Sequence, residues 1–268
     1  MKKFFGKIHS GLQFAFRDSK FGHFWVKAHL QFLVLALLMF AVKATMYFIV
    51  AYIPCEPIMF HMEIDKHIPF IPEFYIFYLS YNVLPVVFLW ILSFYDRRKM
   101  VTIVLGTMAA IVVAYICYLI QQVKMDRVQY EIIAAEYHDF SKVNSLHTLW
   151  LWMIDKQYIA DETALNCFPS LHAIMATSSI LIGLWTGKSE KHFPIWMRLL
   201  FGIWGFLIFI STVFVKQHYF VDIIFGFGLV VVFYFIFKYL VVRPYLKHKE
   251  KKQQAQEEKQ AEEATMEQ

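Results

Sequence analysis

Long apolar runs recur along this chain of 268 residues, and each is about as long as a lipid bilayer is thick. An α-helix needs about 20 consecutive apolar residues to cross the hydrocarbon core of a bilayer. We identify six such runs, of which the fourth is the shortest, at residues 31–53, 74–94, 101–122, 171–187, 195–215 and 219–241. A hydrophobic content of 59% agrees, because soluble domains rarely carry so much apolar material. The sequence therefore predicts an all-α, polytopic membrane protein with six transmembrane helices.

Lysine and arginine residues predict how the spans are oriented. They cluster before the first run, between the second and third, between the fourth and fifth, and after the sixth. With six spans, all four clusters fall on one side of the membrane, and the positive-inside rule makes that side the cytoplasm. Both termini are then cytoplasmic, and loops 54–73 and 123–170 face outward. The net charge of +5 reflects this orientation rather than nucleic-acid binding, because it is divided among patches that flank the spans.

Composition divides the chain into three parts. Residues 1–30 are basic and aromatic, and they form either an interfacial helix on the inner leaflet or an ordinary basic flank. Residues 31–243 form the six-helix domain, and residues 244–268 form a polar cytoplasmic tail without an apolar stripe. Lys43 falls within the first run, where a lysine is a candidate functional residue. We favour a span that begins nearer Trp25, which moves Lys43 towards the outer end.

The two outer loops carry local signals. Prolines in "IDKHIPFIPEF" stop regular helix within loop 54–73. In loop 123–170, a short helix with one apolar side is predicted at headgroup level, formed by Leu146, Leu149, Trp150, Trp152 and Met153. Cys55 and Cys167 both face outward in this topology, so a disulfide between them is a hypothesis, although three sparse cysteines form no disulfide framework.

The stretch "KQHYFVDII" places His218 and Asp222 four residues apart at the outer mouth of the last span. On a helix, this spacing puts both side chains on one face. The carboxylate can accept a hydrogen bond from one imidazole nitrogen, which fixes the tautomer and leaves the other nitrogen available for nucleophilic attack. The pair could equally be a structural hydrogen bond, because this spacing often arises by chance.

The stretch "LNCFPSLHAIM" places Ser170 and His172 at the outer mouth of the fourth span. Ser170 can cap the helix by accepting a hydrogen bond from an orphan backbone N–H. A helix N-terminus with a hydroxyl can also hold phosphate oxygens. His172 could then protonate a leaving oxygen, a role worth about 10²–10⁴-fold in rate. One interfacial histidine is more often structural, but two histidines, a serine and an aspartate on one membrane face indicate a site.

Both stretches resemble motifs of the type-2 phosphatidic acid phosphatase superfamily of membrane lipid phosphatases. That family carries the motifs K-x6-R-P, P-S-G-H and S-R-x5-H-x3-D. The second is similar to residues 169–172, "PSLH", and the third to residues 211–222, "STVFVKQHYFVD", in which the spacing is complete. The forms "FPSLHA" and "KQHYFVD" are most similar to the branch that includes bacterial members and the inositol phosphorylceramide synthases.

The resemblance implies a role for each matching residue. His218 would be the nucleophile that takes the phosphoryl group, and Asp222 would orient it. His172 would protonate the leaving group and then activate the acceptor, while Ser170 and nearby N–H groups would hold phosphate oxygens. The family needs no metal, and we expect no cofactor. The expected partners are membrane lipid phosphates, and the expected location is a plasma membrane with the active site at its outer face.

Two departures from the family motifs remove positive charge. The arginine of the third motif is Thr212 here, and Lys216 could supply compensating charge. The arginine of the first motif best matches Arg127 in "VKMDRVQY", without the proline and lysine that should accompany it, and Lys124 could substitute for the lysine. Stabilising a transferring phosphoryl group without positive charge is hard. All three cations could also be ordinary solvated loop charges.

Three functions remain open from the sequence. The first is a phosphatase for a lipid phosphate or diphosphate, with phosphatidate, phosphatidylglycerophosphate and undecaprenyl diphosphate as candidate substrates. The second is a phosphotransferase that passes the headgroup to an alcohol, as in the phosphorylceramide synthases. The third is a non-catalytic membrane protein that retains the fold, and the missing arginine supports it. The intact set of His172, His218 and Asp222 favours catalysis, and its position at one surface rather than at the midplane disfavours a transporter.

The alignment of the first motif gives a test. We expect Arg127→Ala to lower phosphatase activity strongly and Lys124→Ala to lower it less, because only the first removes the aligned phosphate-binding charge. Phosphate release from lipid substrates measures both. The reverse order would show that the first motif is aligned wrongly.

Overall fold

The computed structural model describes residues 55–125, 139–160, 165–184 and 193–244, shorter stretches between residues 32 and 53, and residues 254 and 256. The helices within these ranges are α3 (Glu63–His67), η1 (Pro72–Phe74), α4 (Tyr75–Ser80), α5 (Leu84–Tyr95), α6 (Arg97–Ile120), η3 (Phe140–Lys142), α8 (Leu146–Ala160), α9 (Leu171–Gly183), α10 (Ile195–Phe214), α11 (Phe220–Ile236) and the π-helical turn η4 (Phe237–Val242). The predictions for residues 1–30, Lys43, Arg127 and nearly all of the tail lie outside the described residues.

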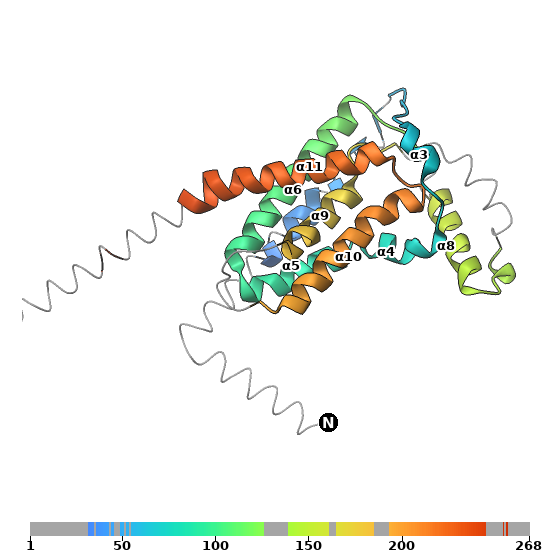
Figure 1. Cartoon of the computed structure of the whole chain (residues 1–268). Coiled ribbons are helices and arrows are strands. Elements are labelled where there is room, and N and C mark those ends of the chain that lie inside the picture. Colours follow the sequence, from blue (N-terminus) through green and yellow to red (C-terminus); the bar gives the residue numbers. More distant parts are fainter. Residues whose placement is uncertain are drawn as a thin grey trace, which may run out of the picture.

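The architecture is an all-helical bundle, as predicted (Figure 1). Among the described residues, three helices are long and apolar enough to cross a bilayer: Arg97–Ile120, Ile195–Phe214 and Phe220–Leu240. A fourth span is formed if the pair Pro72–Ser80 and Leu84–Tyr95, which is bent by 46°, counts as one. The structure therefore supports a membrane bundle with three or four full-length spans in the described part of the chain, and it does not establish the predicted count of six.

The predicted span at 74–94 is broken in the structure. α4 ends at Ser80, a turn covers residues 81–83, and α5 begins at Leu84 with Pro85 in its first turn. Proline fits the first turn of a helix but lacks the N–H that would continue a helix from the preceding turn. Pro85 therefore marks the start of a new helix. The predicted span 74–94 is accordingly two helices, α4 and α5, rather than one.

Helix α9 is the central helix of the bundle, although it is only 13 residues long. It packs against α5, α6, α10 and α11. Nine of its residues are buried, and most of these are small, namely Ala173, Ala176, Thr177, Ser178 and Ser179. Small side chains allow helix backbones to approach closely in a membrane. The helix at the predicted fourth span is thus enclosed by protein on several sides.

Glycines set the distance between α9 and its neighbour α10. A Cβ atom added to Gly205 would lie 2.8 Å from the carbonyl oxygen of Ala176 and 2.7 Å from Cβ of Ser179. At the far end of the same contact, a Cβ on Gly183 would lie 2.5 Å from Cα of Gly202. The two helices therefore meet backbone to backbone along this line, and no other side chain fits there without moving a helix.

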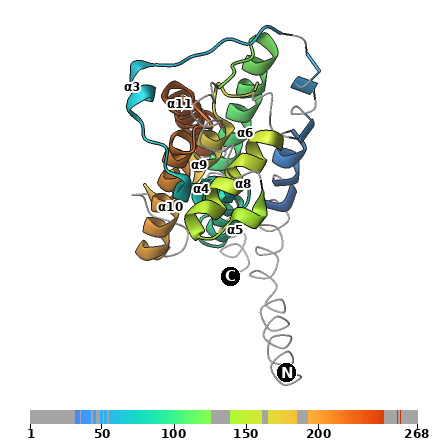
Figure 2. The same ribbon diagram turned by 90° about the vertical axis from the view of Figure 1, so that its right-hand side faces the viewer.

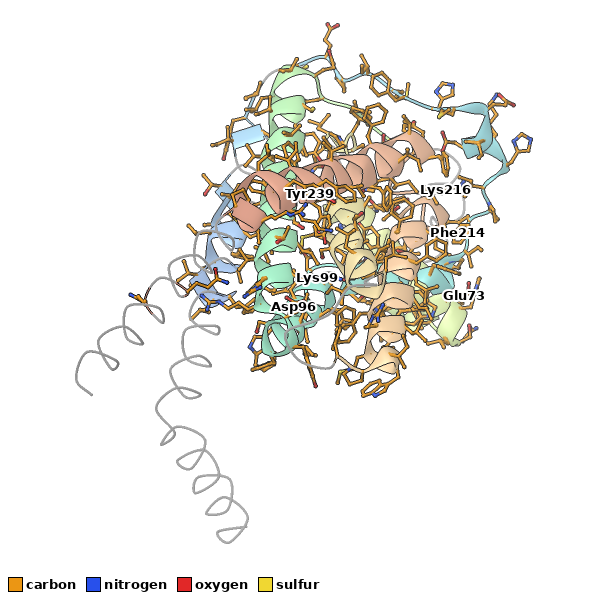
Figure 3. All side chains as sticks on the ribbon, turned by 60° about the vertical axis from the view of Figure 1, so that its left-hand side comes forward. Glu73, Asp96, Lys99, Phe214, Lys216 and Tyr239 are labelled. Carbon is orange, nitrogen blue, oxygen red and sulfur yellow. The ribbon has the colours of Figure 1, made fainter. Side chains whose placement is uncertain are left out.

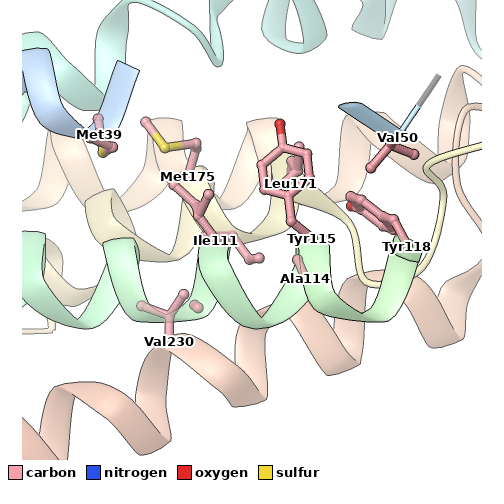
Figure 4. Close-up of a cluster of buried hydrophobic side chains, with 11 residues drawn as sticks. Met39, Val50, Ile111, Ala114, Tyr115, Tyr118, Leu171, Met175 and Val230 are labelled. Carbon is pink, nitrogen blue, oxygen red and sulfur yellow. The ribbon is translucent and has the colours of Figure 1, made fainter. Parts of the chain in front are cut away.

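The largest apolar cluster fills the space between α6, α9 and α11 (Figure 4). Ile111 and Tyr115 of α6 face Leu171 and Met175 of α9, and Val230 of α11 closes the cluster from the other side. Close packing of such side chains is one of the interactions that hold helices together within a bilayer. This packing holds the first turn of α9 in place relative to α6 and α11.

The two ends of the bundle differ. Asp96 and Lys99 lie at the start of α6, whereas Phe214 and Lys216 lie at the opposite end, where α10 finishes (Figure 3). At that second end, the Tyr118 hydroxyl donates a hydrogen bond to the carbonyl of Pro169, so α6 ends where α9 begins. We call it the histidine end, because His172 and His218 both lie there.

Two outer elements cover the histidine end. Residues 55–71, which we call the outer segment, cross it as an extended stretch that contains the short helix α3 (Figures 1 and 2). Helix α8 confirms the predicted short helix, and two residues of the predicted apolar side, Trp150 and Met153, pack against the cluster that includes Ile154, Tyr158 and Val215. Leu146 of that side is 64% exposed. The Tyr158 hydroxyl lies 2.7 Å from the carbonyl oxygens of Val215 and Lys216. α8 thus packs on the turn between α10 and α11 with only part of the predicted apolar side.

The close contact of α9 and α10 predicts an intolerance to one methyl group. We expect Gly205→Ala to destabilise the protein by about 1–3 kcal/mol, because backbone atoms of α9 must move to admit the new carbon. Thermal unfolding in detergent measures the change.

Gly228→Ala is the matched control, since a Cβ there meets nothing within 4 Å. A Gly205→Ala protein as stable as Gly228→Ala would contradict the described packing.

Candidate active site

The site is built where the first turns of α9 and α11 meet. Ser170 is the N-cap of α9, and its hydroxyl accepts a hydrogen bond from the N–H of Ala173 at 3.2 Å. Its own backbone N–H donates to the carbonyl of Asp222 at 3.1 Å. The Asp222 carboxylate in turn caps α11 by accepting from the N–H of Tyr219 at 2.9 Å. These bonds join the two sequence stretches that were predicted to act together.

His172 and His218 are in direct contact. Nδ1 of His172 lies 3.1 Å from Nε2 of His218, although the residues are 46 positions apart in the chain. The His218 side chain is only 6% exposed. The structure therefore brings the two predicted catalytic histidines together at hydrogen-bonding distance.

The partners of His218 determine which of its nitrogens carries the proton. Nδ1 lies 2.9 Å from the carbonyl oxygen of Cys167 and 3.5 Å from Oδ2 of Asp222. Both oxygens can only accept, so we assign the proton of the neutral ring to Nδ1. The lone pair of Nε2 then points at His172, which donates from its Nδ1. The closer partner is the carbonyl, and the longer contact to Asp222 adds negative charge beside the same N–H.

Two tyrosines contact the ring of His172. The Tyr78 ring stacks on it with centroids 4.4 Å apart, and the Tyr81 ring lies 3.7 Å away at 40°. Both come from α4 and the turn after it, in the broken span. Aromatic packing restricts the orientation of the imidazole, so α4 fixes the direction in which Nδ1 points.

The turn before α11 places His218. The carbonyl of Thr212 accepts from the N–H of Gln217 at 2.9 Å and from that of His218 at 3.2 Å. Lys216 has a φ of 53°, which lies in the left-handed region that residues other than glycine rarely adopt. Thr212 stands where the family motif has arginine, and its hydroxyl donates to the carbonyl of Phe209. It therefore supports the turn with its backbone and brings no charge to the histidines.

The three predicted phosphate-binding cations are placed differently. Nζ of Lys216 donates to the carbonyl of Ile68 at 2.6 Å and to that of Asp65 at 3.3 Å. Burial lowers the pKa of Lys216, and the nearby Asp65 carboxylate acts in the opposite direction. Lys124 is exposed, and its backbone pairs with Ile58. Arg127 lies outside the described residues, so phosphate binding by these cations stays a prediction.

Comparison with known protein families matches residues 51–236 to the PAP2 superfamily. The chain belongs to the PAP2 superfamily. The match covers every element of the site described above, from the outer segment to α11. No curated protein and no solved structure is significantly similar to the chain. PAP2 proteins are in general phosphatases and phosphotransferases, and the membership indicates lipid-phosphatase-like activity.

Several residues of this PAP2 site were not predicted from the sequence. Tyr78 and Tyr81 were read as part of an ordinary span, although their spacing of three residues places them on one helix face. The contact made by the Cys167 carbonyl could not be predicted from the sequence, because every residue has a backbone carbonyl. The thiols also behave differently from the hypothesis, since no disulfide joins Cys55, Cys117 and Cys167, all of which are described.

The described ranges contain no group of three or more histidine, cysteine, aspartate or glutamate side chains placed to hold a metal ion.

The contact between α11 and the start of α9 gives a second prediction. A Cβ on Gly226 would lie 2.8 Å from the carbonyl oxygen of Ser170 and 3.1 Å from Cβ of Ala173. We expect Gly226→Ala to push α11 away from α9 and to lower kcat by about 10²-fold, the effect of roughly 1 Å of misplacement. Phosphate release from a lipid phosphate measures it.

Gly228→Ala, two residues further along the same helix, should keep its activity. Equal kcat values for the two variants would contradict a site that depends on this contact.

Proposed function

We propose that this PAP2 protein is an integral-membrane phosphatase that removes phosphate from a lipid phosphate or diphosphate through a phosphohistidine intermediate. The observation that carries the proposal is the arrangement of His218. Its Nδ1–H is held by the Cys167 carbonyl and the Asp222 carboxylate, while Nε2 faces Nδ1 of His172 at 3.1 Å. A nucleophile next to a base or acid, and oriented by a third group, is the arrangement that covalent catalysis requires.

The first step transfers the phosphoryl group to the enzyme. Nε2 of His218 attacks phosphorus, and the P–O bond to the lipid alcohol breaks as the P–N bond forms. His172 acts as the imidazolium and gives the proton on Nδ1 to the leaving oxygen, so the alcohol departs neutral. The positive charge on the phosphorylated ring is stabilised by Asp222.

The second step releases the group. Nδ1 of His172, now neutral, accepts a proton from water as the water oxygen attacks phosphorus. The P–N bond breaks, the electron pair returns to Nε2 of His218, and inorganic phosphate leaves. Both histidines regain their initial protonation, so the cycle needs no group beyond those of the chain, the substrate and water.

Positive charge for the phosphoryl oxygens comes from three sources in this proposal. The N-terminus of α9 offers N–H groups next to Ser170, and a helix N-terminus favours anions. The imidazolium of His172 supplies a full charge. Arg127 and Lys124, the cations assigned to the first motif, supply the remaining charge.

The substrate is a membrane lipid whose headgroup reaches the histidine end. This end lies opposite Asp96 and Lys99, where basic residues indicate the cytoplasmic side (Figure 3). The active site therefore faces the outer leaflet of a plasma membrane, with both termini in the cytoplasm. Lipid phosphates lie at this depth, which explains why polar residues stand at the mouths of apolar helices.

A phosphotransferase is the second candidate, because an alcohol can replace water in the second step. The same two histidines would serve both reactions, since His172 can activate either acceptor at Nδ1. A non-catalytic protein would have no need for the His172–His218 contact.

The first test compares the wild-type protein with His218→Ala. We expect purified wild-type protein in detergent to release phosphate from at least one of phosphatidate, phosphatidylglycerophosphate or undecaprenyl diphosphate. His218→Ala should lose at least about 10⁴-fold of this activity, since the nucleophile is gone. Both proteins should have the same thermal unfolding midpoint to within a few degrees.

Near-normal turnover by His218→Ala would sink the assignment of the nucleophile. Activity should also survive a strong chelator, and its loss there would count against a histidine mechanism. If no lipid releases phosphate, inositol and other alcohols are added with a glycerophospholipid donor. If no transfer to these alcohols is measured either, the result favours the non-catalytic protein.

A further inference from the structure

The outer segment is tied to the turn that carries His218 by a carboxylate. Oδ1 of Asp65 accepts from the backbone N–H of Phe220 at 2.7 Å, and Oδ2 accepts from that of Met62 at 2.7 Å. Phe220 is the first residue of α11, and its N–H is one of the orphan donors at that helix end. Asp65 therefore supplies a helix cap from a residue 155 positions earlier in the chain.

A second link between the same two segments starts from a lysine side chain in the turn and ends on backbone carbonyls of the outer segment. Lys216 lies two residues before His218, and its ammonium donates to the carbonyls of Ile68 and Asp65 at 2.6 and 3.3 Å. A third bond runs from the N–H of Ile71 to the carbonyl of Phe214 at 3.0 Å. Outer-segment contacts thus fall at 214, 216 and 220, on both sides of the histidine in sequence.

We propose that Asp65 is a positioning residue for the phosphoryl-transfer reaction, and that it acts together with Lys216. We call the hydrogen bonds that these two residues make between residues 65–68 and 216–220 the strap. This inference rests on the proposed function. The strap fixes the left-handed turn at Lys216 and the first N–H of α11, and so it sets where Nε2 of His218 lies relative to His172. Asp65 needs no contact with substrate for this.

The strap gives Lys216 a role that differs from phosphate binding. An ammonium whose hydrogen bonds go to two carbonyls of residues 65–68 holds the segment, whereas a phosphate clamp would direct them to the substrate. The two roles predict different couplings between Asp65 and Lys216. The two residues make separate hydrogen bonds between the same two segments, so they act as a unit if losing either one releases the turn. Residues that act as a unit show non-additive substitution effects, and independent residues show additive ones.

A double-mutant cycle on the full-length protein in detergent tests the strap. The variants are Asp65→Ala, Lys216→Gly and the double substitution, and glycine is chosen because it accepts the φ of 53° at that position. We expect each single variant to lower kcat, Asp65→Ala by about 10²-fold, with KM within about threefold, because geometry rather than binding is lost. The double variant should be no slower than the slower single variant.

Two further variants define the comparison. Asp65→Asn keeps an oxygen that can accept from Phe220, and it should restore kcat to within about tenfold of wild type. Glu63→Gln breaks the exposed ion pair between Glu63 and Lys66 on the same short helix, and it should leave kcat unchanged. If Asp65→Ala does not fold, hydrogen exchange of Lys216→Gly tests the strap: faster exchange of the amides at 218–222 than in Glu63→Gln supports it, and equal exchange overturns it.

The opposite results overturn the strap. They are a kcat of Asp65→Ala within threefold of wild type, or effects of Asp65 and Lys216 that add. A Lys216→Gly variant that raises KM and weakens inhibition by orthovanadate, with kcat unchanged, would assign Lys216 to phosphate binding instead.

Hydrogen exchange separates failure of the strap from failure of the proposed function. Faster exchange of the amides at 218–222 in Asp65→Ala than in Glu63→Gln supports the strap even if no lipid is hydrolysed. Equal exchange in the two variants overturns it.

Discussion

The fold depends on how closely α9 approaches its neighbours. Gly205 and Gly226, on α10 and α11, each leave room for the backbone of α9 and for nothing larger. Lipid tails are as apolar as leucine, so helices in a bilayer associate through close packing and interhelical hydrogen bonds rather than through the hydrophobic effect. The same close approach lets the N–H of Ser170 reach the carbonyl of Asp222. One packing constraint therefore both assembles the bundle and aligns the two stretches that carry the histidines.

The polar groups at the histidine end are held by backbone bonds more than by other side chains. His218 Nδ1 is closest to a carbonyl, Ser170 and Asp222 cap helices, and Lys216 donates to two carbonyls. Buried polar groups are costly unless they are hydrogen-bonded, and backbone partners remain in place when side chains rearrange. The site is thus preformed by the same bonds that end the helices around it. The outer segment belongs to this framework, because two of its residues bond to the turn that carries His218.

Much of this could be predicted from the sequence, and the exceptions have physical causes. Apolar runs locate α6, α9, α10 and α11 to within a few residues. The contact of His218 with Asp222 was predicted from a shared helix face, but His218 lies in the turn before α11, which brings its Nδ1 to 3.5 Å from Oδ2 of Asp222. Pro85 is visible in the sequence, but the residues on both sides of it are apolar, so the two helices look like one continuous span. The roles of Tyr78 and Asp65 depend on tertiary contacts with residues about 90 or more positions away, which no local pattern encodes. The Cys167 carbonyl carries no residue-type signal at all.

The contact between the two histidines has a consequence for substrate choice. Under the proposed function, the phosphoryl group must react in the space that a hydrogen bond between the rings occupies at 3.1 Å. A substrate would first have to separate the rings and replace that bond. Under the proposed function, a lipid can draw on the contacts of its acyl chains for this opening, in the way that remote binding energy is used to reach a reactive state. Free phosphate esters in water have no such chains. The enzyme would therefore discriminate against soluble metabolites through the closed resting state itself, without any pocket that recognises the tail.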